Sequence, residues 1–517
     1  MTLHRFHGGL KLAAHKSVST ASSCAACVLP TELVLPVNQH AGDAAECVVQ
    51  VGQYVRRGEL IARAVGERSA AVHASSSGTV IAIEMRATPQ ASAETALCVV
   101  IATDGRDETQ TLTPIENWRD VSREILLERI AAAGIVGLGG AAFPSAMKLS
   151  VTRDTLILNG AECEPYISCD EVLMRERAAE VIAGTQLLAH ICKAERVVLA
   201  VEDRMREAHA ALAAAIQDAA IELICVPTIY PAGGERQLIR VITGHEVPSG
   251  GLPRDIGVIC HNVATAVAAW RAVVHGEALT ERIVTITGRG VKKPGNFRVR
   301  LGTPIAHLVE QAGGYTPQAA RLVMGGQMMG VALPNDATPI MKATNCVLVL
   351  ADKDVQPTAP ELPCIRCGEC AEACPAQLLP QTLLTQLRDG AFGAADQQGL
   401  FDCIECGACA FVCPSQIPLV DWYRFGKSEL RLRQDQLARA DLARARYHAR
   451  NERLARNAAE RVARVAARGE EPASQAATAP ENAEPVTPQP ANTSAMDKAA
   501  VLAAIARGKA KRQTPPT

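Results

Sequence analysis

Two short runs of cysteines determine how one part of this chain folds. The first is Cys364-Ile-Arg-Cys367-Gly-Glu-Cys370-Ala-Glu-Ala-Cys374-Pro375, and the second is Cys403-Ile-Glu-Cys406-Gly-Ala-Cys409-Ala-Phe-Val-Cys413-Pro414. Each has the spacing of a tight loop that wraps three thiolates around one cubane cluster, followed by a fourth cysteine and a proline. The repeated signature predicts a pair of 4Fe-4S clusters.

The spacing also predicts which thiolates share a cluster, because in this arrangement the fourth cysteine of each run ligates the other cluster. One ligand set is then Cys364, Cys367, Cys370 and Cys413, and the other is Cys374, Cys403, Cys406 and Cys409. Clusters held by crossed ligands lie close together, which suits one-electron transfer. A structural zinc site is the alternative, but zinc closes at four ligands and does not require this spacing twice.

Length and composition indicate a large globular protein without a membrane span. The chain has 517 residues, of which 48% are hydrophobic and 21% charged, so several domains are expected. No stretch approaches the roughly 20 apolar residues that a transmembrane helix needs, and the first residues lack the apolar core of a secretory signal. A net charge of -1 gives no electrostatic reason to expect a nucleic-acid partner. The cytoplasm is the expected compartment.

The part of the chain before the cysteine runs divides into modules. After an N-terminal segment (1–29), short apolar runs separated by glycine predict a small all-β module over 30–105. It resembles the barrel-sandwich hybrid of lipoyl and biotinyl carriers, but its hairpin stretch 66–74 lacks their lysine, so we expect a docking or scaffolding role. Alternating helices and strands predict an α/β domain over 120–275, with a single long helix over 171–193. A β-grasp module, similar to SLBB domains, is expected over 280–350.

The remaining segments follow from composition. The cysteine runs define a double 4Fe-4S ferredoxin domain over 358–422. Residues 427–468 are rich in Ala, Leu and Arg, which favours a long basic helix. Residues 469–517 predict a disordered linker and a short terminal helix that either folds against a partner or frays. Cys24 and Cys27 form an isolated Cys-x-x-Cys pair in a loop-like setting, and we interpret them as thiols without a metal.

A glycine-rich loop in the α/β domain is a candidate phosphate site. The segment 137–142 matches the dinucleotide pattern G-x-G-x-x-A, but a helix, not a strand, is expected before it, so it is a poor Rossmann motif. Exposed glycine amides followed by Pro144 and Lys148 can hold a phosphate group, as at a helix N-terminus. A purely structural turn is the alternative that the spacing leaves open.

These features together resemble a known family, the C subunits of the Rnf (Rsx) ion-translocating electron-transport complex. The similarity runs from about residue 4 to 421 and rests on Gly8-Gly9, His15-Lys16, Gln39-His40-x-Gly42, the lysine-free barrel and the two complete cysteine runs. The FMN- and NADH-binding subunit of respiratory complex I is similar but more distant, because it has one cluster at this place and lacks the N-terminal module.

The resemblance implies site residues. Non-covalent FMN is expected on residues of the glycine loop, of 159–166 and of two later segments, namely Gly139, Gly140, Phe143, Lys148, Asn159, Glu235 and Asn262. Glu164 would be the catalytic residue on the nicotinamide side. Two departures from complex I stand in the loop, which has Leu138 in place of an arginine and Ala142 in place of a glycine.

The resemblance also implies a function and partners. The chain would be a translocase-linked oxidoreductase subunit that transfers electrons between NAD(H) and other subunits through FMN and two 4Fe-4S clusters. It would be peripheral, on the cytoplasmic side of the cell inner membrane, and would exchange electrons with a ferredoxin-like subunit. Two alternatives stay open: a soluble diaphorase subunit of a hydrogenase or formate dehydrogenase, and a non-enzymatic iron-sulfur relay.

Overall fold

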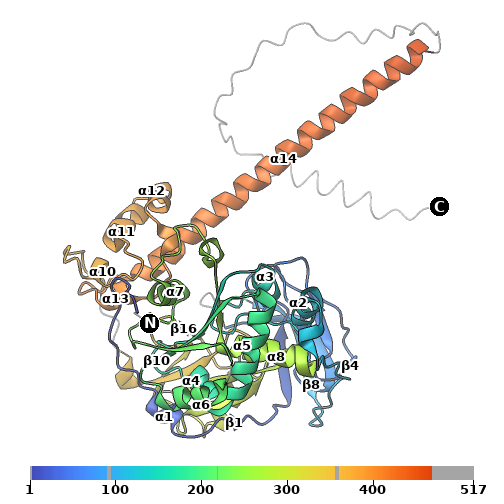
Figure 1. Ribbon diagram of the computed structural model, residues 1–517. Helices are drawn as coiled ribbons and strands as arrows, with labels where there is room; N and C mark the ends of the chain where they lie inside the picture. The colour runs from blue at the N-terminus through green and yellow to red at the C-terminus, as the bar shows by residue number, and fades with distance from the viewer. Residues whose placement is uncertain (1–2, 90–94, 218, 356–359, 468–517) are drawn as a thin grey trace, which may run out of the picture. The chain divides into compact units, whose positions relative to one another are not determined.

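The computed structural model describes residues 3–89, 95–217, 219–355 and 360–467. The chain forms two compact units, residues 1–435 and 436–517. The first unit contains the barrel, the α/β domain, the β-grasp module and the cysteine runs (Figure 1). Among the described residues, no helix has both the length and the apolar character that crossing a bilayer demands.

The N-terminal module is built of two small antiparallel sheets, as expected for a barrel-sandwich hybrid. One sheet has the order β2-β8-β7-β4 and the other β3-β5-β6. Leu33, Val55, Ile61 and Ile101 come from both sheets and are fully buried in one shared core. The strands are β2 (Glu32–Pro36), β3 (Glu46–Cys47), β4 (Tyr54–Val55), β5 (Leu60–Arg63), β6 (Val72–His73), β7 (Gly78–Ala87) and β8 (Thr95–Thr103).

The α/β domain has a four-stranded, fully parallel sheet in the order β11-β10-β9-β12. Its strands are β9 (Thr155–Gly160), β10 (Arg196–Glu202), β11 (Glu222–Val226) and β12 (Val258–Asn262). Leu156 and Leu158 enter the apolar core on one face and Ile157 the core on the other, so β9 is covered on both sides. The carboxyl ends of the strands meet at one edge, which is where ligands bind in sheets of this kind.

Helices cover both faces of this sheet. They are α2 (Arg123–Ala132), α3 (Ser145–Leu149), α4 (Cys169–Glu176), α5 (Ala178–Cys192), α6 (Arg206–Ile216), α7 (Glu235–Thr243) and α8 (Val263–Trp270), with η1 (Trp118–Asp120), η2 (Pro253–Ile256) and η3 (Arg271–His275). The prediction of one helix over 171–193 was wrong, because Arg177 leaves helical geometry (φ -130°, ψ 37°) and separates α4 from α5. Both helices bury their apolar faces, so the apolar pattern continues across the break and conceals it.

The β-grasp module is a six-stranded sheet in the order β1-β14-β13-β17-β15-β16, accompanied by α9 (Ile305–Gln311). The strands are β1 (Ala25–Ala26), β13 (Glu281–Thr287), β14 (Gly295–Arg300), β15 (Ala319–Met324), β16 (Val331–Ala332) and β17 (Cys346–Ala351), followed by η4 (Asp352–Asp354). The edge strand β1 comes from the N-terminal segment, after α1 (Ser17–Thr20), and pairs in parallel with β14. Cys24 and Cys27 lie on either side of this two-residue strand, and neither is part of it.

The cysteine runs form two copies of one backbone structure. Arg366 and Glu405 both have φ of 58°, and Gly368 (88°) and Gly407 (78°) are also left-handed. Each run contains a short helix, and these two helices lie against each other. The elements here are α10 (Glu369–Glu372), α11 (Pro380–Arg388), α12 (Phe392–Gln397), η5 (Leu400–Asp402), α13 (Ala408–Phe411) and the start of α14 (Leu419–Ala467).

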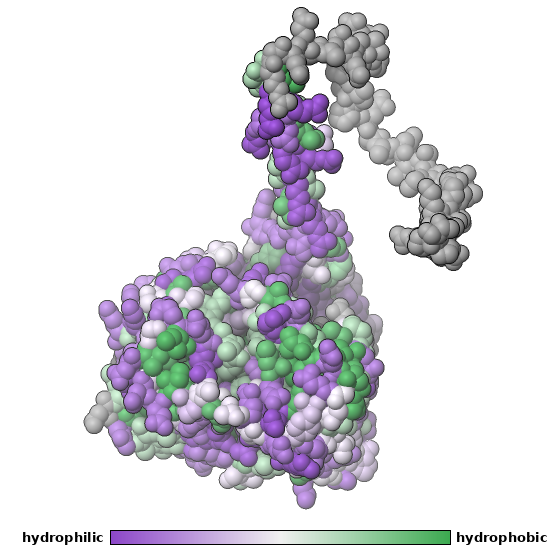
Figure 2. Space-filling model, turned by 90° about the vertical axis from the view of Figure 1, so that its right-hand side faces the viewer, coloured by the Kyte–Doolittle hydropathy of each residue, from purple (hydrophilic) through white to green (hydrophobic). Residues whose placement is uncertain are grey.

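The basic helix is present, and it starts earlier than 427 because α14 already begins at Leu419. Leu419, Tyr423 and Leu430 are buried in the core of the cluster domain, which accounts for the earlier start. In the second unit, residues 436–467 of this helix are exposed throughout and carry mainly hydrophilic side chains (Figure 2). The linker and terminal helix expected for 469–517 lie outside the described residues.

Candidate functional site

The glycine-rich loop leaves α2 and is closed at its base by backbone hydrogen bonds. The amide of Gly137 donates to the carbonyl of Phe143 (2.9 Å), and the amide of Leu138 donates to the Thr265 hydroxyl on α8 (2.9 Å). Gly139 and Gly140 are exposed on the crest of the loop. Gly140 has φ of +114°, and a Cβ built there meets no described atom within 4 Å. The crest is therefore open to a ligand from outside.

Asn262 brings the end of β12 under this loop. Its Oδ1 accepts from the Ala264 amide (2.9 Å) and so caps α8, while its Nδ2 donates to Asp170 (2.6 Å). A Cβ on Gly139 would stand 3.2 Å from the Cβ of Asn262. This close approach explains why a glycine occupies position 139. It also shows that two of the predicted site residues, Gly139 and Asn262, lie side by side.

Asn159, at the end of β9, connects the sheet edge to a second loop. Its Nδ2 donates to the carbonyl of Gly233 (2.8 Å), and its Oδ1 accepts from the Ala161 amide (3.0 Å). Two residues later, Glu235 begins α7 and pairs with Lys148, whose Nζ lies 2.5 Å from its Oε1. Lys148, Asn159 and Glu235 are thus linked by contacts across this edge of the sheet.

The residues around the loop fit an FMN phosphate. Lys148 supplies a half-buried cation, and the crest of the loop supplies backbone amides. Ser145, the first residue of α3 directly after the loop, has a buried hydroxyl oxygen without a hydrogen-bond partner among the described residues. Half-buried Phe143 adds an aromatic wall. A buried oxygen without a partner, such as that of Ser145, is expected where a polar ligand completes the site.

Glu164 faces a different neighbour from the other predicted residues. Its Oε1 accepts from the amides of Met328 (2.7 Å) and Met329 (3.0 Å), in a loop of the β-grasp module. Burial raises the pKa of its carboxyl group, while these amides oppose the rise. The structure therefore ties Glu164 to the loop before β16, and no contact joins its carboxylate to the glycine loop in the described part of the chain.

The two cysteine runs create a cradle with crossed membership. Cys374 of the first run lines one small hollow together with Cys403, Cys406 and Cys409 of the second. Burial raises the pKa of Cys370, and the nearby fourth cysteine of the other run, Cys413, adds to the rise. Burial raises the pKa of Cys406 to about 12, so this thiol stays protonated unless a positive partner such as cluster iron binds it. The arrangement fits the ligand sets expected from the spacing.

Tyr230 connects the loop between β11 and α7 to the cysteine cradle, and no motif in the sequence singles it out. It is buried, and its hydroxyl donates to the carbonyl of Cys406 (2.6 Å). It stands three residues before Gly233, which contacts Asn159. One short loop thus touches both the end of β9 and a predicted cluster ligand.

Known proteins match the chain along most of its length. Four family models match in succession: the RnfC barrel sandwich hybrid domain (residues 4–106), the Nuo51 FMN-binding domain (130–271), the SLBB domain (283–332) and the 4Fe-4S dicluster domain (363–417). The C subunit of the ion-translocating oxidoreductase complex from Pectobacterium atrosepticum is 44% identical over 89% of this chain and 67% of its own. The chain belongs to the family of these C subunits.

Two further C subunits of this complex support the same family. Those of Pseudomonas aeruginosa and Erwinia tasmaniensis are both 46% identical over 89% of this chain, and the chain covers 60% and 58% of them. The chain thus spans about three fifths of these two relatives. A solved NAD+-reducing [NiFe]-hydrogenase chain superposes with a TM-score of 0.42 at 18% identity, over 58% of this chain and 62% of that one, which is too weak to carry an argument.

The matches confirm the predicted family and fold class. This C-subunit chain contains an FMN-binding domain and a 4Fe-4S dicluster domain, as the glycine loop and the cysteine spacing led us to expect. The individual FMN residues, the cluster ligands and the domain boundaries given above stay predictions.

Two buried basic side chains of the β-grasp module contact the glycine loop of this C-subunit chain and the turn that leads into it. Lys342 is fully buried, and its Nζ donates to the carbonyls of Ala71 (2.7 Å) and Gly134 (2.8 Å). Arg282 donates to the carbonyls of Leu138 (3.2 Å) and Lys342. Where the flavin subunit of complex I has an arginine inside its loop, this chain brings an arginine to Leu138 from another module.

Removing Lys342 should loosen this support. In Lys342→Met, two buried carbonyls lose their donor, each at a cost of about 1–3 kcal/mol. We expect FMN to bind at least about fivefold more weakly because the loop base shifts, with cluster iron unchanged. Fluorescence titration with FMN measures the effect, and exposed Lys353→Met is the matched control. Equal FMN affinity in the two variants would show that the loop does not depend on Lys342.

A buried charged cluster lies beside Asn262. Glu162 accepts from the amide of Asp170 (3.1 Å), and its Oε2 lies 3.9 Å from the Nζ of Lys16. Burial raises the pKa of Glu162 to about 7, with Lys16 opposing the rise and Asp170 adding to it. Because Asp170 also binds Asn262, the charge of this cluster is connected to the sheet edge.

The pKa of Glu162 predicts a pH dependence of stability. The unfolded state loses this proton near the ordinary value of 4.5 and the folded state near 7, so stability falls as pH rises between them. Glu162→Gln lacks this cost. Its melting temperature relative to wild type should therefore rise from about pH 5 to about pH 8, by the equivalent of up to about 3 kcal/mol. Exposed Glu124→Gln should show a constant difference, and a constant difference for Glu162→Gln would contradict the prediction.

Proposed function

We propose that this chain transfers electrons between NAD(H) and other subunits of a membrane-bound, ion-translocating complex. It belongs to the C-subunit family and carries both an FMN-binding and a dicluster domain, which supports an oxidoreductase part of a larger complex. FMN exchanges two electrons with nicotinamide and single electrons with iron-sulfur clusters, so it converts between the two kinds of transfer. The role of the chain is to hold the nicotinamide, FMN and the clusters in the order in which electrons pass between them.

The observation that carries this proposal is the bridge made by Tyr230. Its hydroxyl binds the carbonyl of Cys406, and the loop that follows it meets Asn159 at the end of β9. Gly233 of this loop also donates to the Sγ of Cys163 (3.2 Å). The proposed flavin edge therefore adjoins the ligand set that contains Cys406, which makes this cluster the first acceptor on the way out.

The other ligand set is suited to be the exit. Cys364 and Cys367 are exposed, whereas Cys374, Cys406 and Cys409 are buried. Apolar Ile365, which is 68% exposed, and Leu362 lie beside them and offer a contact surface for another subunit. In the proposed order, electrons pass from the flavin to the buried cluster, then to the exposed cluster, and then to a ferredoxin-like subunit.

The proposed roles of the flavin residues follow from their places. Lys148 and the amides of Gly139 and Gly140 hold the phosphate, and Phe143 shapes the pocket. Asn159 and Asn262 orient the flavin from the strand ends, and Glu235 sets the position of Lys148. For Glu164, proposed on the nicotinamide side, the amides of Met328 and Met329 fix the carboxylate and couple it to the β-grasp module. The complex would sit at the cytoplasmic face of the inner membrane.

Anaerobic reduction of the full chain, reconstituted with iron, sulfide and FMN, tests this function. We expect NADH to bleach the flavin and to generate reduced-cluster EPR signals, and we expect neither cluster signal when FMN is omitted. Dithionite should reduce the clusters in both samples. Flavin bleaching without any cluster signal would contradict the proposed order, and so would NADH-driven cluster reduction without FMN. Membrane fractionation with and without salt then separates a membrane-complex role from that of a soluble diaphorase.

A further inference from the structure

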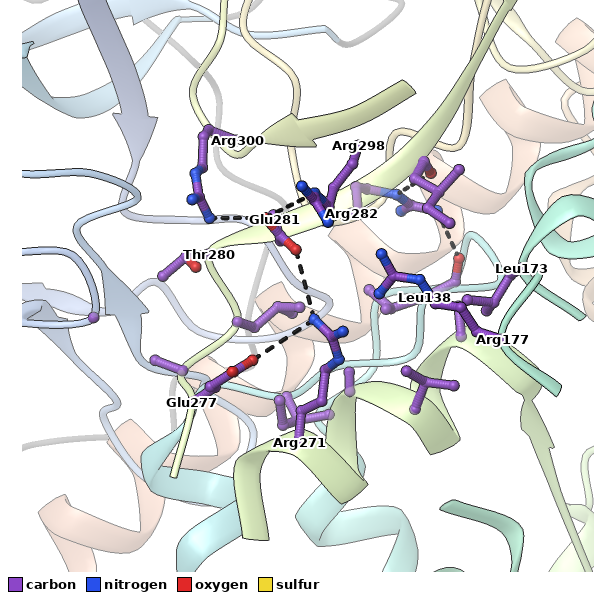
Figure 3. A pocket seen from close by; sticks show the side chains of 18 of the residues that line it. Leu138, Leu173, Arg177, Arg271, Glu277, Thr280, Glu281, Arg282, Arg298 and Arg300 are labelled. Carbon is purple, nitrogen blue, oxygen red and sulfur yellow. Dashed lines mark hydrogen bonds and ion pairs between the residues drawn. The ribbon is translucent and has the colours of Figure 1, made fainter. Parts of the chain in front are cut away.

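A cavity of about 300 Å³ lies behind the glycine loop, where three modules meet (Figure 3). Its walls come from α4 and α8 of the α/β domain, from β13 and β14 of the β-grasp module, and from Arg57 and Gly58 of the barrel. Leu138 of the glycine loop lines this cavity. Gly139 and Gly140 are not part of its lining and are exposed on the crest of the loop. The volume is at the lower end of the range for small-molecule sites.

Arginines dominate the lining of this cavity, with six guanidinium groups against three carboxylates. The arginines are Arg57, Arg177, Arg271, Arg282, Arg298 and Arg300, and the acids are Asp170, Glu277 and Glu281. The acids are already engaged. Glu281 lies 2.8 Å from Arg300, 3.6 Å from Arg271 and 3.7 Å from Arg298. Asp107 outside the lining is shared by Arg57 and Arg300, and Glu180 pairs with Arg271 at 2.8 Å.

Three of these guanidinium groups lack a carboxylate at hydrogen-bonding distance among the described residues. Arg177 is 3.8 Å from Glu180, and Arg298 is 3.7 Å from Glu281. Arg282 is only 6% exposed, and it donates to backbone carbonyls. Arg177 at the α4–α5 break and Arg298 on β14 reach into the cavity from different walls, with Arg282 between them (Figure 3). Arg282 is buried, whereas Arg177 is half-buried and the Arg298 side chain is 42% exposed. Guanidinium groups that face one space, with their carboxylates beyond hydrogen-bonding distance, favour an anion in that space.

We propose that this cavity binds a phosphate group through Arg177, Arg282 and Arg298. Guanidinium groups present paired N–H donors that match the oxygens of a phosphate, and several of them around one space are a pattern suited to phosphate recognition. The ligand is either a free inorganic phosphate anion or the phosphate group of a nucleotide. Because Leu138 separates the cavity from the crest, this site is distinct from the proposed flavin phosphate site. A phosphate bound in this cavity would affect the position of the glycine loop, because Leu138 lines the cavity and Arg282 donates to the Leu138 carbonyl.

Calorimetric titration of the FMN- and cluster-loaded full chain with inorganic pyrophosphate, in phosphate-free buffer, tests the proposal. We expect saturable binding of one pyrophosphate per chain, with FMN retained. The double variant Arg177→Gln/Arg298→Gln should bind it at least about tenfold more weakly, because two charge-assisted contacts are lost. Arg177→Lys/Arg298→Lys should keep part of the affinity, which guards against a folding defect. Arg63→Gln, whose partner is Glu46 in the barrel, should bind like wild type.

A second arm of the same experiment distinguishes the sources of the phosphate. Tighter binding of ADP than of pyrophosphate would assign a nucleotide, and weaker binding would assign the free anion. The proposal is overturned if wild type shows no saturable pyrophosphate binding, if the Gln double variant binds like wild type, or if pyrophosphate displaces FMN. Tighter binding of citrate than of pyrophosphate and ADP would also overturn it, because the site would then be one for carboxylates.

Discussion

Cys374→Ser will abolish the same cluster as Cys403→Ser, although the two cysteines belong to different runs. Cys374 lines one hollow with Cys403, Cys406 and Cys409, so in the predicted ligand set loss of either thiolate removes a ligand from the same cluster. Cys370→Ser should abolish the second cluster instead. In each variant the iron content should fall by about half, because a serine oxygen replaces one of four sulfur ligands.

EPR spectra of the dithionite-reduced variants are the measurement. Cys374→Ser and Cys403→Ser should retain one common signal, and Cys370→Ser should retain the other. Cys225→Ser, which changes an exposed thiol on β11, should keep both signals and all the iron. If Cys374→Ser and Cys370→Ser lost the same signal, the ligands would not be crossed. If the order of transfer is right, NADH should still reduce the remaining cluster in Cys370→Ser, because the cluster next to Tyr230 is intact there.

Loss of the cation at Lys148 should have the second-largest effect. Lys148→Met would remove the proposed charge-assisted contact to the FMN phosphate, worth about 1.5–3 kcal/mol, so FMN should bind about tenfold to a hundredfold more weakly. The cluster content should not change, because Lys148 lies at the end of α3. Stability should change by less than about 1 kcal/mol, since its ion pair with Glu235 is partly exposed.

Equilibrium titration of the deflavinated chain with FMN, followed by quenching of flavin fluorescence, measures this effect. Lys148→Arg should keep most of the affinity, and exposed Lys293→Met should bind FMN like wild type. Wild-type affinity in Lys148→Met would remove Lys148 from the flavin site. It would also point to the loop amides and Ser145 as the principal phosphate donors.

The features that could be predicted from the sequence are those encoded by local spacing. The cysteine runs define their own loops, and alternating strands and helices define the α/β domain without reference to the rest of the chain. Contacts between distant modules could not be predicted in this way. Tyr230 and Cys406 are 176 residues apart, Arg282 and Leu138 are 144 apart, and Lys342 and Gly134 are 208 apart.

The break at Arg177 shows a different limit of prediction from sequence. The apolar residues of α4 and α5 keep a continuous helical period, so nothing in the pattern marks the change of direction. The break moves Arg177 to the wall of the arginine-lined cavity, a place that a continuous helix over 171–193 would not have suggested. Residues that close cavities between modules are thus the hardest to find from sequence.

In the proposed function, one chain joins a flavin to two clusters in series. The most direct test of this order is freeze-quench EPR of the fully loaded chain mixed with NADH under anaerobic conditions. We predict that flavin bleaching comes first, followed by the signal that Cys370→Ser retains and then by the signal that Cys374→Ser retains. Appearance of the exposed cluster's signal before that of the cluster beside Tyr230, or the absence of both while the flavin is reduced, would contradict it.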